Sequence, residues 1–402
     1  MKLYLIKLGK AMAAVRRDGI IVGGRRSLGY LATFFRTMLN FKSGDVLFVT
    51  GGVGDSANYR SYNVAEELNL HGIKAEVMIQ DNPFLPKFAD KFKVFVFHRT
   101  LFTPAVKKLI DNIKKRNKEM IFETDDLVFD AKYMHATDSY KNMGYFEKKQ
   151  YEKGVGEEIL KDGYVKTCST STNYLAKILE GYGKKVFLVR NKLSDKDLEI
   201  ADNILENEKE LSSLSSRSLA PGNDIKIGYF SGTMSHNRDF ATITDALMAI
   251  MEKYPQVELF LAGPLEIENR LNKFKGRIRV SPFVPREKHF ENVASVDINL
   301  APLEIGDAYC ESKSEIKFSG AGILEVPTVA AATQTFREAI SDGIDGFVAN
   351  STDEWVEKLE KLITDKELRM RMGKAAREKV LREYTNKNSH DEEYYNYLRS
   401  KL

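Results

Sequence analysis

Cysteine is scarce in this chain, which has only Cys168 and Cys310 among its 402 residues. Two cysteines cannot form the disulfide framework of a small secreted protein, and these two lack the spacing of metal ligands. Their scarcity favours a reducing compartment, so we expect the protein in the cytoplasm.

Long hydrophobic runs are also missing. No window reaches the roughly 18 uninterrupted apolar residues that a membrane-spanning helix needs. Charges at Lys7, Lys10 and Arg16 interrupt the N-terminal region, so we expect no signal peptide. With 43% hydrophobic residues and a mean hydropathy of −0.35, the composition is that of a globular protein. A chain of 402 residues is long enough for two domains of ordinary size.

Charge is unevenly spread along the chain. Residues 1–43 contain nine Lys or Arg and a single acid, Asp18, so this segment carries +8 while the rest carries −4 of the net +4. The segment also holds an apolar, aromatic stretch at 28–41, and cations beside such a stretch suit the surface of an anionic bilayer. The alternative is a helix that packs on the first domain with a solvated basic face. A nucleic-acid partner is not expected, because the remainder is acidic and does not interleave aromatic with basic residues.

Short apolar runs alternate with helical patterns along most of the chain. This alternation predicts parallel sheets covered by helices on both faces. We expect strands in a first domain at 44–50, 74–79, 93–97, 119–123, 164–168 and 185–189, and in a second at 225–231, 257–262, 296–301, 327–331 and 345–349. Helices are expected in the second domain at 238–253, 286–294, 315–325, 335–341, 352–364 and 366–384.

A polar, Ser-rich stretch that ends in Pro221-Gly222 separates the two sets of strands and predicts an interdomain connection. The predicted organisation is a basic segment 1–43, a first Rossmann-like domain 44–191, a connection 192–224, a second Rossmann-like domain 225–384, and a C-terminal helix in 385–402 that crosses back to the first domain. Ligands of such sheets bind beyond the carboxyl ends of the strands, where the motifs below fall.

The most informative stretch is 311–347. A charged loop with Lys313 and Lys317 leads into a short helix of small residues, which a strand led by Pro327 follows. A helix N-terminus with cations beside it suits a diphosphate. Glu311 and Glu315 flank these lysines, and the alternative is that both glutamates are solvated or pair with them.

A second candidate phosphate site opens the second domain. A strand is followed by the turn Ser231-Gly232 and then by Arg238 at the start of a helix. Glycine lets a ligand approach the backbone closely, and an Arg guanidinium can donate two hydrogen bonds to a phosphate. The alternative is an ordinary strand-to-helix connection with a surface arginine.

These segments resemble the donor-binding region of GT-B glycosyltransferases of the retaining family-4 type. The branch that this chain resembles is common in bacterial surface-polysaccharide synthesis and carries a Lys-Ser-x-x-Lys-Phe run, matching Lys313–Phe318. The resemblance implies an α/β fold of the GT-B class, with two Rossmann-like doubly wound domains facing across a cleft. It also implies a nucleotide-sugar donor and no metal or other cofactor for the chemistry.

The sequence departs from that family at Thr233, Arg238 and Gly320. The family's Arg and Lys that grip the donor diphosphate align with Thr233 and Arg238, and its ribose-binding Glu aligns with Gly320. The resemblance therefore implies that Lys313 or Lys317 supplies the missing cation. It also implies that Glu311 reaches the sugar hydroxyls, with Glu315 a weaker candidate.

Three motifs of the first domain also lie after predicted strands. His98 ends one strand; a lone His is more often structural, but the family places an active-site His there, which implies catalysis or sugar contact. Asp125 and Asp126 follow the next strand and suit acceptor binding or shaping of the cleft, the alternative being a helix cap with first-turn acids. The loop with Gly52 resembles the family's first Gly loop, and it is not the dinucleotide fingerprint of an oxidoreductase.

The resulting hypothesis is an enzyme that transfers a sugar, with retention, from a nucleotide-sugar to a glycan acceptor. We expect this acceptor to be lipid-linked and the enzyme to act at the inner face of the cell membrane. Two other functions stay open. One is a GT-B nucleotide-sugar epimerase, and the other is a degenerate, non-catalytic module that binds a glycan or a partner enzyme.

Overall fold

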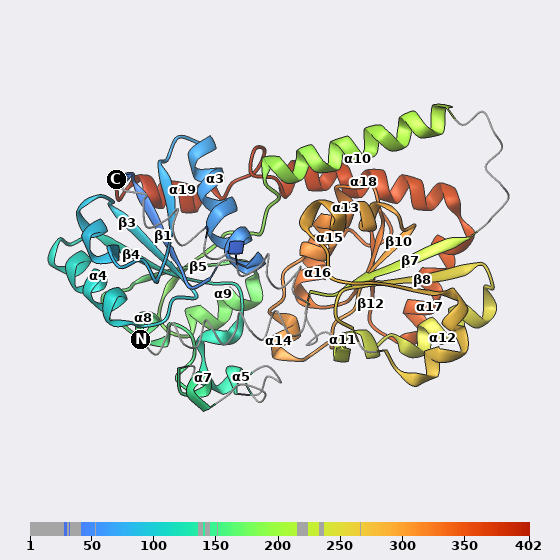
Figure 1. Cartoon of the computed structure of the whole chain (residues 1–402), viewed down its shortest axis with the longest axis horizontal. Helices are drawn as coiled ribbons and strands as arrows, with labels where there is room; N and C mark the ends of the chain where they lie inside the picture. The colour runs from blue at the N-terminus through green and yellow to red at the C-terminus, as the bar shows by residue number, and fades with distance from the viewer. Residues whose placement is uncertain are drawn as a thin grey trace. The chain divides into compact units, whose positions relative to one another are not determined.

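The computed structural model describes residues 28–29, 32, 42–52, 54–135, 140, 145–150, 152–214, 224–232, 237–265 and 267–402. The predicted basic segment 1–43 lies almost wholly outside the described residues, as does Thr233. Contacts divide the chain into two units, one running to Val189 and taking in His390–Leu402, the other spanning Arg190–Ser389 (Figure 1). Each unit is an α/β unit built on its own sheet.

The first unit is built on six parallel strands in the order β2-β1-β3-β4-β5-β6. The strands are β1 Val46–Thr50, β2 Ala75–Ile79, β3 Val94–His98, β4 Glu119–Thr124, β5 Thr167–Thr170 and β6 Lys185–Leu188. Every residue of β1 and β3 is buried, as expected of central strands covered by helices on both faces. The six strands agree with those predicted to within about three residues at each end.

Helices and turns cover this sheet. They are α2 Asp55–Ala57, a π-helical turn Asn58–Tyr62, α3 Asn63–Leu70, 3₁₀ turns Leu85–Asp90 and Leu127–Phe129, α4 Pro104–Lys115, α5 Ala131–Met134, α7 Tyr145–Gln150, α8 Glu157–Leu160, α9 Asn173–Glu180 and α19 Glu392–Arg399. Helix α4 shows why these segments are helical. The Thr103 hydroxyl accepts from the Val106 N–H, Pro104 occupies the first turn, and the apolar side faces inward.

A buried ion pair anchors the helical segment that follows β1. The Arg60 guanidinium is fully buried and donates from Nε to Glu123 Oε1 at 2.8 Å and from Nη2 to Oε2 at 2.9 Å. Ser169 also donates to Glu123 Oε2 at 2.6 Å. Because two hydrogen bonds join the pair, the helix beyond the first loop is held over β4 and β5.

The C-terminal helix α19 completes the core of the first unit. Tyr394, Tyr395 and Leu398 are buried there, and the Tyr395 hydroxyl lies 3.1 Å from Glu67 Oε1. Phe187 of β6 contacts the ring of Tyr394 at a centroid distance of 5.5 Å. The last residues of the chain are therefore part of the first unit.

The second unit is built on six parallel strands in the order β12-β11-β10-β7-β8-β9. They are β7 Ile225–Phe230, β8 Val257–Ala262, β9 Ile278–Ser281, β10 Ile298–Ala301, β11 Thr328–Ala331 and β12 Phe347–Ala349. The helices are α10 Asp195–Leu214, α11 Asn237–Ala241, α12 Thr244–Lys253, a 3₁₀ segment Asn269–Arg277, α13 Arg286–Ala294, α14 Ala308–Glu311, α15 Ile316–Gly322, α16 Gln334–Ala339, α17 Thr352–Thr364 and α18 Lys366–Glu383.

Strand β9 was not predicted from the sequence. It lies at the edge of the sheet, has only four residues, and leaves Val280 72% exposed between two polar residues, Arg279 and Ser281. A short edge strand buries little on either face, so it lacks the continuous apolar run that identifies the other strands.

The range 192–224, predicted as an interdomain connection, consists largely of helix α10, which packs on the second unit. Asp197 accepts from Arg286 Nε at 2.7 Å, and Asp202 pairs with Arg377 Nη2 at 2.5 Å. Because both arginines belong to the second unit, α10 is part of that unit. The unit also extends to Ser389, five residues beyond the predicted domain end.

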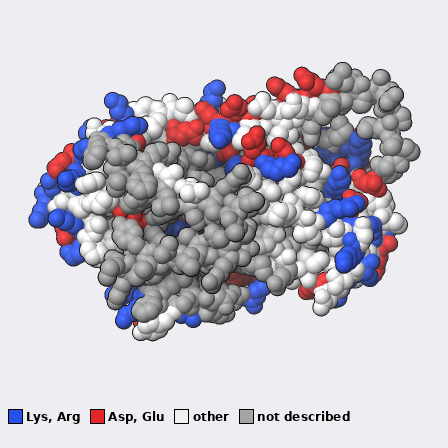
Figure 2. Space-filling view, in the orientation of Figure 1, with Lys and Arg blue, Asp and Glu red and all other residues white. Residues whose placement is uncertain are grey.

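The described surface carries both signs of charge. Figure 2 shows basic and acidic side chains interspersed over the described part of the face drawn. No helix among the described residues has the length and apolar character needed to cross a bilayer.

Candidate functional site

Polar side chains gather at the carboxyl ends of β1, β3 and β4 in the first unit. We call this group the β3–β4 cluster; its members are Thr50, Ser56, His98, Arg99, Asp125 and Asp126. It brings together the predicted residues His98, Asp125 and Asp126. The other three members, Thr50, Ser56 and Arg99, were not among the predicted site residues.

His98 lies at the centre of this cluster. Its Nδ1 is 3.2 Å from the Thr50 hydroxyl, and its Nε2 is 3.1 Å from Ser56 Oγ and 3.4 Å from Asp125 Oδ1. The residue is only 1% exposed. The ring is thus held almost entirely by the protein's own groups, and catalysis or sugar contact by His98 stays a prediction.

Asp125 is held in its ionised form. Burial alone would raise its pKa, but the Arg99 charge and the hydrogen bonds from His98 and Ser56 hold the pKa well below its ordinary value. Arg99 Nε donates to Asp125 Oδ1 at 2.6 Å, and Arg99 Nη2 to Asp126 Oδ2 at 3.2 Å. The arginine therefore links the two predicted acids.

Asp126 also has a local role. Its carboxylate accepts from the Leu127 N–H at 2.8 Å and so caps the 3₁₀ turn that follows β4. We gave a helix cap as the alternative to acceptor binding, and Asp126 does act as such a cap.

The backbone at Arg99 is unusual, with a φ of 44° in the left-handed region that favours glycine. Its carbonyl oxygen would lie 1.9 Å from a Cβ placed on Gly51, so position 51 accepts no side chain. Such backbone conformations gather at functional sites. The next residue, Gly52, is partly exposed and has open space around its Cα.

In the second unit, the predicted donor residues lie in loops and helix starts that follow its strands, with Arg238 in α11 and Lys317 in α15. Ser231 is buried after β7, and its carbonyl oxygen would lie 1.9 Å from a Cβ placed on Gly263 after β8. This close approach requires glycine at 263, which has a φ of 91°. Gly232, by contrast, is exposed and has no atom within 4 Å of a Cβ built on it.

The side chain of Lys317 points toward the carboxyl end of β7. Its ammonium donates to the Phe230 carbonyl and lies 4.8 Å from the centre of the Tyr229 ring. Burial lowers the pKa of Lys317 to about 8, and the nearby Asp239 carboxylate acts in the opposite direction. Asp239 also accepts from Cys310 Sγ at 3.1 Å, so this acid connects α11, α14 and α15 and was missed by the sequence hypothesis.

Glu311 and Glu315 are both engaged by the protein. Glu311 accepts from the Gly306 N–H at 3.0 Å and the Gln334 N–H at 2.9 Å, which ties the loop before α14 to the start of α16. Glu315 is 1% exposed and lies 3.4 Å from Arg190 Nη1. These contacts give both glutamates a structural role, and the contact of either with a donor sugar stays a prediction.

The two remaining cations are nearer the surface. The Arg238 side chain is 72% exposed, with its Nε 3.7 Å from Glu304 Oε1. The Lys313 ammonium lies 4.0 Å from the centre of the Tyr309 ring. An exposed cation such as Arg238 can turn toward an anion at small cost.

Gly320 lies in α15, and a Cβ built on it meets no atom within 4 Å. The position at which the resembling family carries its ribose-binding glutamate is therefore open rather than filled by another group.

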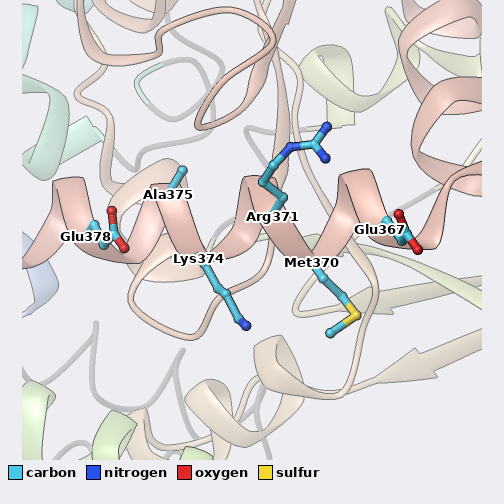
Figure 3. Close-up of a pocket in the computed structure, with 6 residues that line it drawn as sticks. All are labelled: Glu367, Met370, Arg371, Lys374, Ala375 and Glu378. Carbon is cyan, nitrogen blue, oxygen red and sulfur yellow. The ribbon is translucent and has the colours of Figure 1, made fainter.

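A pocket elsewhere in the second unit lies along one side of α18 (Figure 3). Its lining residues are Glu367, Met370, Arg371, Lys374, Ala375 and Glu378, which recur every three or four positions on one helix. No predicted site residue lines it. The pocket is thus separate from the carboxyl ends of the strands.

Metal binding finds no support in the described part of the chain, where no three His, Cys, Asp or Glu side chains are grouped closely enough to hold an ion.

Comparison with known proteins identifies the class of the fold. Residues 243–392 match the model of a family described as glycosyl transferase-like. A search of curated proteins finds no match.

Three solved structures align with nearly the whole chain. HepE of Anabaena, solved with UDP-glucose, is 13% identical with a TM-score of 0.57, covering 89% of this chain and 100% of its own. Sucrose-phosphate synthase of Thermosynechococcus elongatus is 12% identical with a TM-score of 0.56 and the same coverage. A glycosyltransferase of Rickettsia africae is 14% identical with a TM-score of 0.57, covering 90% of this chain and 99% of its own.

These findings confirm the predicted fold. Two parallel six-stranded sheets with flanking helices, aligned over nearly their full length with glycosyltransferase structures, define the GT-B class. The match of residues 243–392 to a glycosyl transferase-like family model agrees with this fold. Retention and the polysaccharide pathway stay predictions.

Proposed function

We propose that this protein is a glycosyltransferase that moves a sugar, with retention of configuration, from a nucleotide-sugar to a glycan acceptor. The observation that carries the proposal is the glycosyltransferase-like match over 243–392, the region that contains Lys313, Lys317 and most of the second sheet. Among the structures with the same fold, HepE was solved with UDP and with UDP-glucose.

The charges of the second unit suit the leaving diphosphate. Arg238 and Lys313 are near the surface, after β7 and before α15, and can turn toward phosphate oxygens. Lys317 adds a third cation whose ammonium lies at the carboxyl end of β7. Cations placed where negative charge develops lower the barrier to its departure.

For retention, the acceptor hydroxyl would attack on the face that the diphosphate leaves, and the leaving phosphate would take the proton. This course needs no protein base, which agrees with a buried His98. It also needs no metal ion.

The acceptor in this proposal is a lipid-linked glycan of a bacterial surface polysaccharide. Its support is the basic, aromatic composition of residues 1–43, which suits the anionic inner face of the cell membrane. Deletion of 1–43 should weaken sedimentation with phosphatidylglycerol liposomes, and undiminished binding would reject this part.

The test of function is release of nucleoside diphosphate from a panel of nucleotide-sugars, with and without a lipid-linked glycan extract. A transferase releases the diphosphate faster when the acceptor is present. An epimerase changes the sugar or releases it without acceptor, and a degenerate module binds without turnover. Either of these two results would reject the proposal.

A further inference from the structure

Asp239 is a buried acid on the short helix α11, which also carries Arg238. The two neighbours differ in exposure, since the Arg238 side chain is 72% exposed and Asp239 is 5% exposed. The Asp239 carboxylate accepts a hydrogen bond from Cys310 Sγ of α14 at 3.1 Å. Because Arg238 is one of the cations proposed for the diphosphate, the buried acid lies next to the same site.

Lys317 reaches this part of the second unit from α15. Its ammonium donates to the Phe230 carbonyl oxygen and lies 4.8 Å from the centre of the Tyr229 ring. That ring also packs against Phe240, the residue that follows Asp239, with 5.0 Å between the ring centres. The carboxyl end of β7 therefore brings the acid of α11 and the ammonium of α15 into one cluster.

Further titratable side chains surround this pair, namely His289, Tyr229 and Cys310. Burial lowers the pKa of His289 to about 4, and the charges of Arg286 and Lys317 act in the same direction. Burial raises the pKa of both the tyrosine hydroxyl and the thiol above their ordinary values. These groups are therefore uncharged near neutral pH. Within the described residues of this cluster, Asp239 is the acid that acts on the Lys317 ammonium.

The acid opposes what burial does to the lysine. Burial lowers the pKa of Lys317 to about 8, because a buried ammonium loses hydration, and the Asp239 carboxylate acts against burial. Without that carboxylate, a larger fraction of Lys317 would be neutral near pH 7. A neutral amine does not attract a phosphate, so the acid determines how much of this cation is present.

We propose that Asp239 is a positioning residue, which keeps Lys317 charged at the carboxyl end of β7 when the donor diphosphate binds. The inference rests on the proposed function and deepens it, since it names the group that maintains one of the proposed cations. A carboxylate by itself repels a diphosphate. Asp239 therefore favours binding only through Lys317, which separates its effect from that of Arg238.

The first measurement needs no nucleotide-sugar. NMR titration of isotope-labelled lysine side chains, with the Lys317 signal assigned from K317M, follows the proton on this ammonium. Asp239→Asn keeps the shape of the side chain and an oxygen that can accept from Cys310, but removes the charge. It should lower the Lys317 pKa by about one unit. An unchanged pKa would overturn the inference.

Two variants serve as controls for this titration. Asp245→Asn also removes one acid of the second unit, but Asp245 is 63% exposed and pairs with Arg270. Cys310→Ala removes the thiol and leaves the Asp239 carboxylate. Both should leave the Lys317 pKa close to that of the unaltered protein. A shift as large as that of D239N would assign the effect to net charge in the first variant or to packing in the second, and either result would overturn the inference.

The second measurement is calorimetric titration with UDP-glucose, whose diphosphate does not titrate between pH 6 and 7.5. Over this range D239N should lose about fourfold in affinity while the unaltered protein loses little, because the charge on Lys317 is lost at a lower pH in the variant. In K317M, adding D239N should cause no further pH dependence. Weakening by the same factor at every pH would show a merely structural role and overturn the inference.

Failure of the proposed function would look different. If UDP-glucose and the other nucleotide-sugars of the panel do not bind at any pH, that function is contradicted. The lysine titration of the free protein would still decide whether Asp239 maintains the charge on Lys317.

Discussion

The polar groups of the two units are held in opposite ways. In the first unit, His98, Asp125 and Ser56 are joined by hydrogen bonds of 2.7 to 3.4 Å, and the histidine is buried. In the second, Arg238 is 72% exposed and its closest acid oxygen is 3.7 Å away. In the first unit these polar groups hydrogen-bond to one another within the protein. In the second, an exposed cation can turn toward a bound anion.

Because of this difference, substitutions in the two units should change different properties of the protein. Removing a buried, hydrogen-bonded group leaves a partner unsatisfied, which costs folding free energy. Removing an exposed cation changes stability little but weakens attraction for a phosphate. Substitutions in the first unit should therefore act on unfolding, and those at the cations of the second on nucleotide affinity.

The largest effect is expected at the buried ion pair beneath the β3–β4 cluster. Arg60→Met leaves Glu123 buried without its counter-ion and should destabilise the first unit by about 3–5 kcal/mol. Chemical denaturation followed by circular dichroism checks this. The double variant R60M/E123L should recover most of the loss, and a single variant as stable as the parent would show that the pair matters little.

Lys317 should make nucleotide affinity depend on pH. Burial lowers its pKa to about 8, so the free protein loses this charge as the pH rises past that value. Because phosphate favours the charged form, affinity for UDP should fall about tenfold between pH 7 and 9. Calorimetric titration of K317M should show a flat profile across this range, and an equally steep profile in the variant would assign the dependence elsewhere.

Arg238 should contribute a smaller, salt-dependent part of the affinity. Arg238→Ala is expected to weaken UDP binding about fivefold at low salt, with less effect at high salt because exposed charges are screened. Lys253→Ala is the matched control, since Lys253 is also an exposed cation of the second unit but pairs with Glu360. Equal losses in the two variants would mean that Arg238 acts only through net charge.

The smallest effect concerns two glycines of α15. Gly320→Ala meets open space and should stabilise the protein by about 0.5–1 kcal/mol, because alanine favours the helix. Gly322→Ala should destabilise it, since the new Cβ would lie 2.9 Å from Val380 Cγ2. Thermal unfolding of the two variants gives the comparison, and a destabilising Gly320→Ala would show that position 320 is not open.

The sequence predicted the fold better than the site. Eleven strands were found because buried parallel strands form continuous apolar runs, and β9 was missed because it is short and exposed. His98 and Asp125 were predicted from their places after strands, and the structure brings His98 Nε2 to 3.4 Å from Asp125 Oδ1. Ser56 and Asp239 were missed because each is recognised only by a partner distant in the chain, Asp125 for one and Cys310 for the other.

Glu311 shows a different limit of sequence reasoning. The family resemblance implies that it reaches a sugar, and in the structure its two carboxylate oxygens accept from the backbone N–H groups of Gly306 and Gln334. A charged side chain that stabilises a loop has the same local sequence as one that binds a ligand. Only the neighbouring backbone distinguishes them.

The most direct test of the central claim is a thermal-shift screen of the full chain against a panel of nucleotide-sugars, repeated with R238A/K313A. We predict that at least one nucleotide-sugar raises the unfolding midpoint of the unaltered protein, and that the double variant loses most of this shift while unfolding at a similar temperature on its own. If no nucleotide-sugar shifts the midpoint, or if the double variant responds as the unaltered protein does, the assignment of the second unit as a nucleotide-sugar site is contradicted.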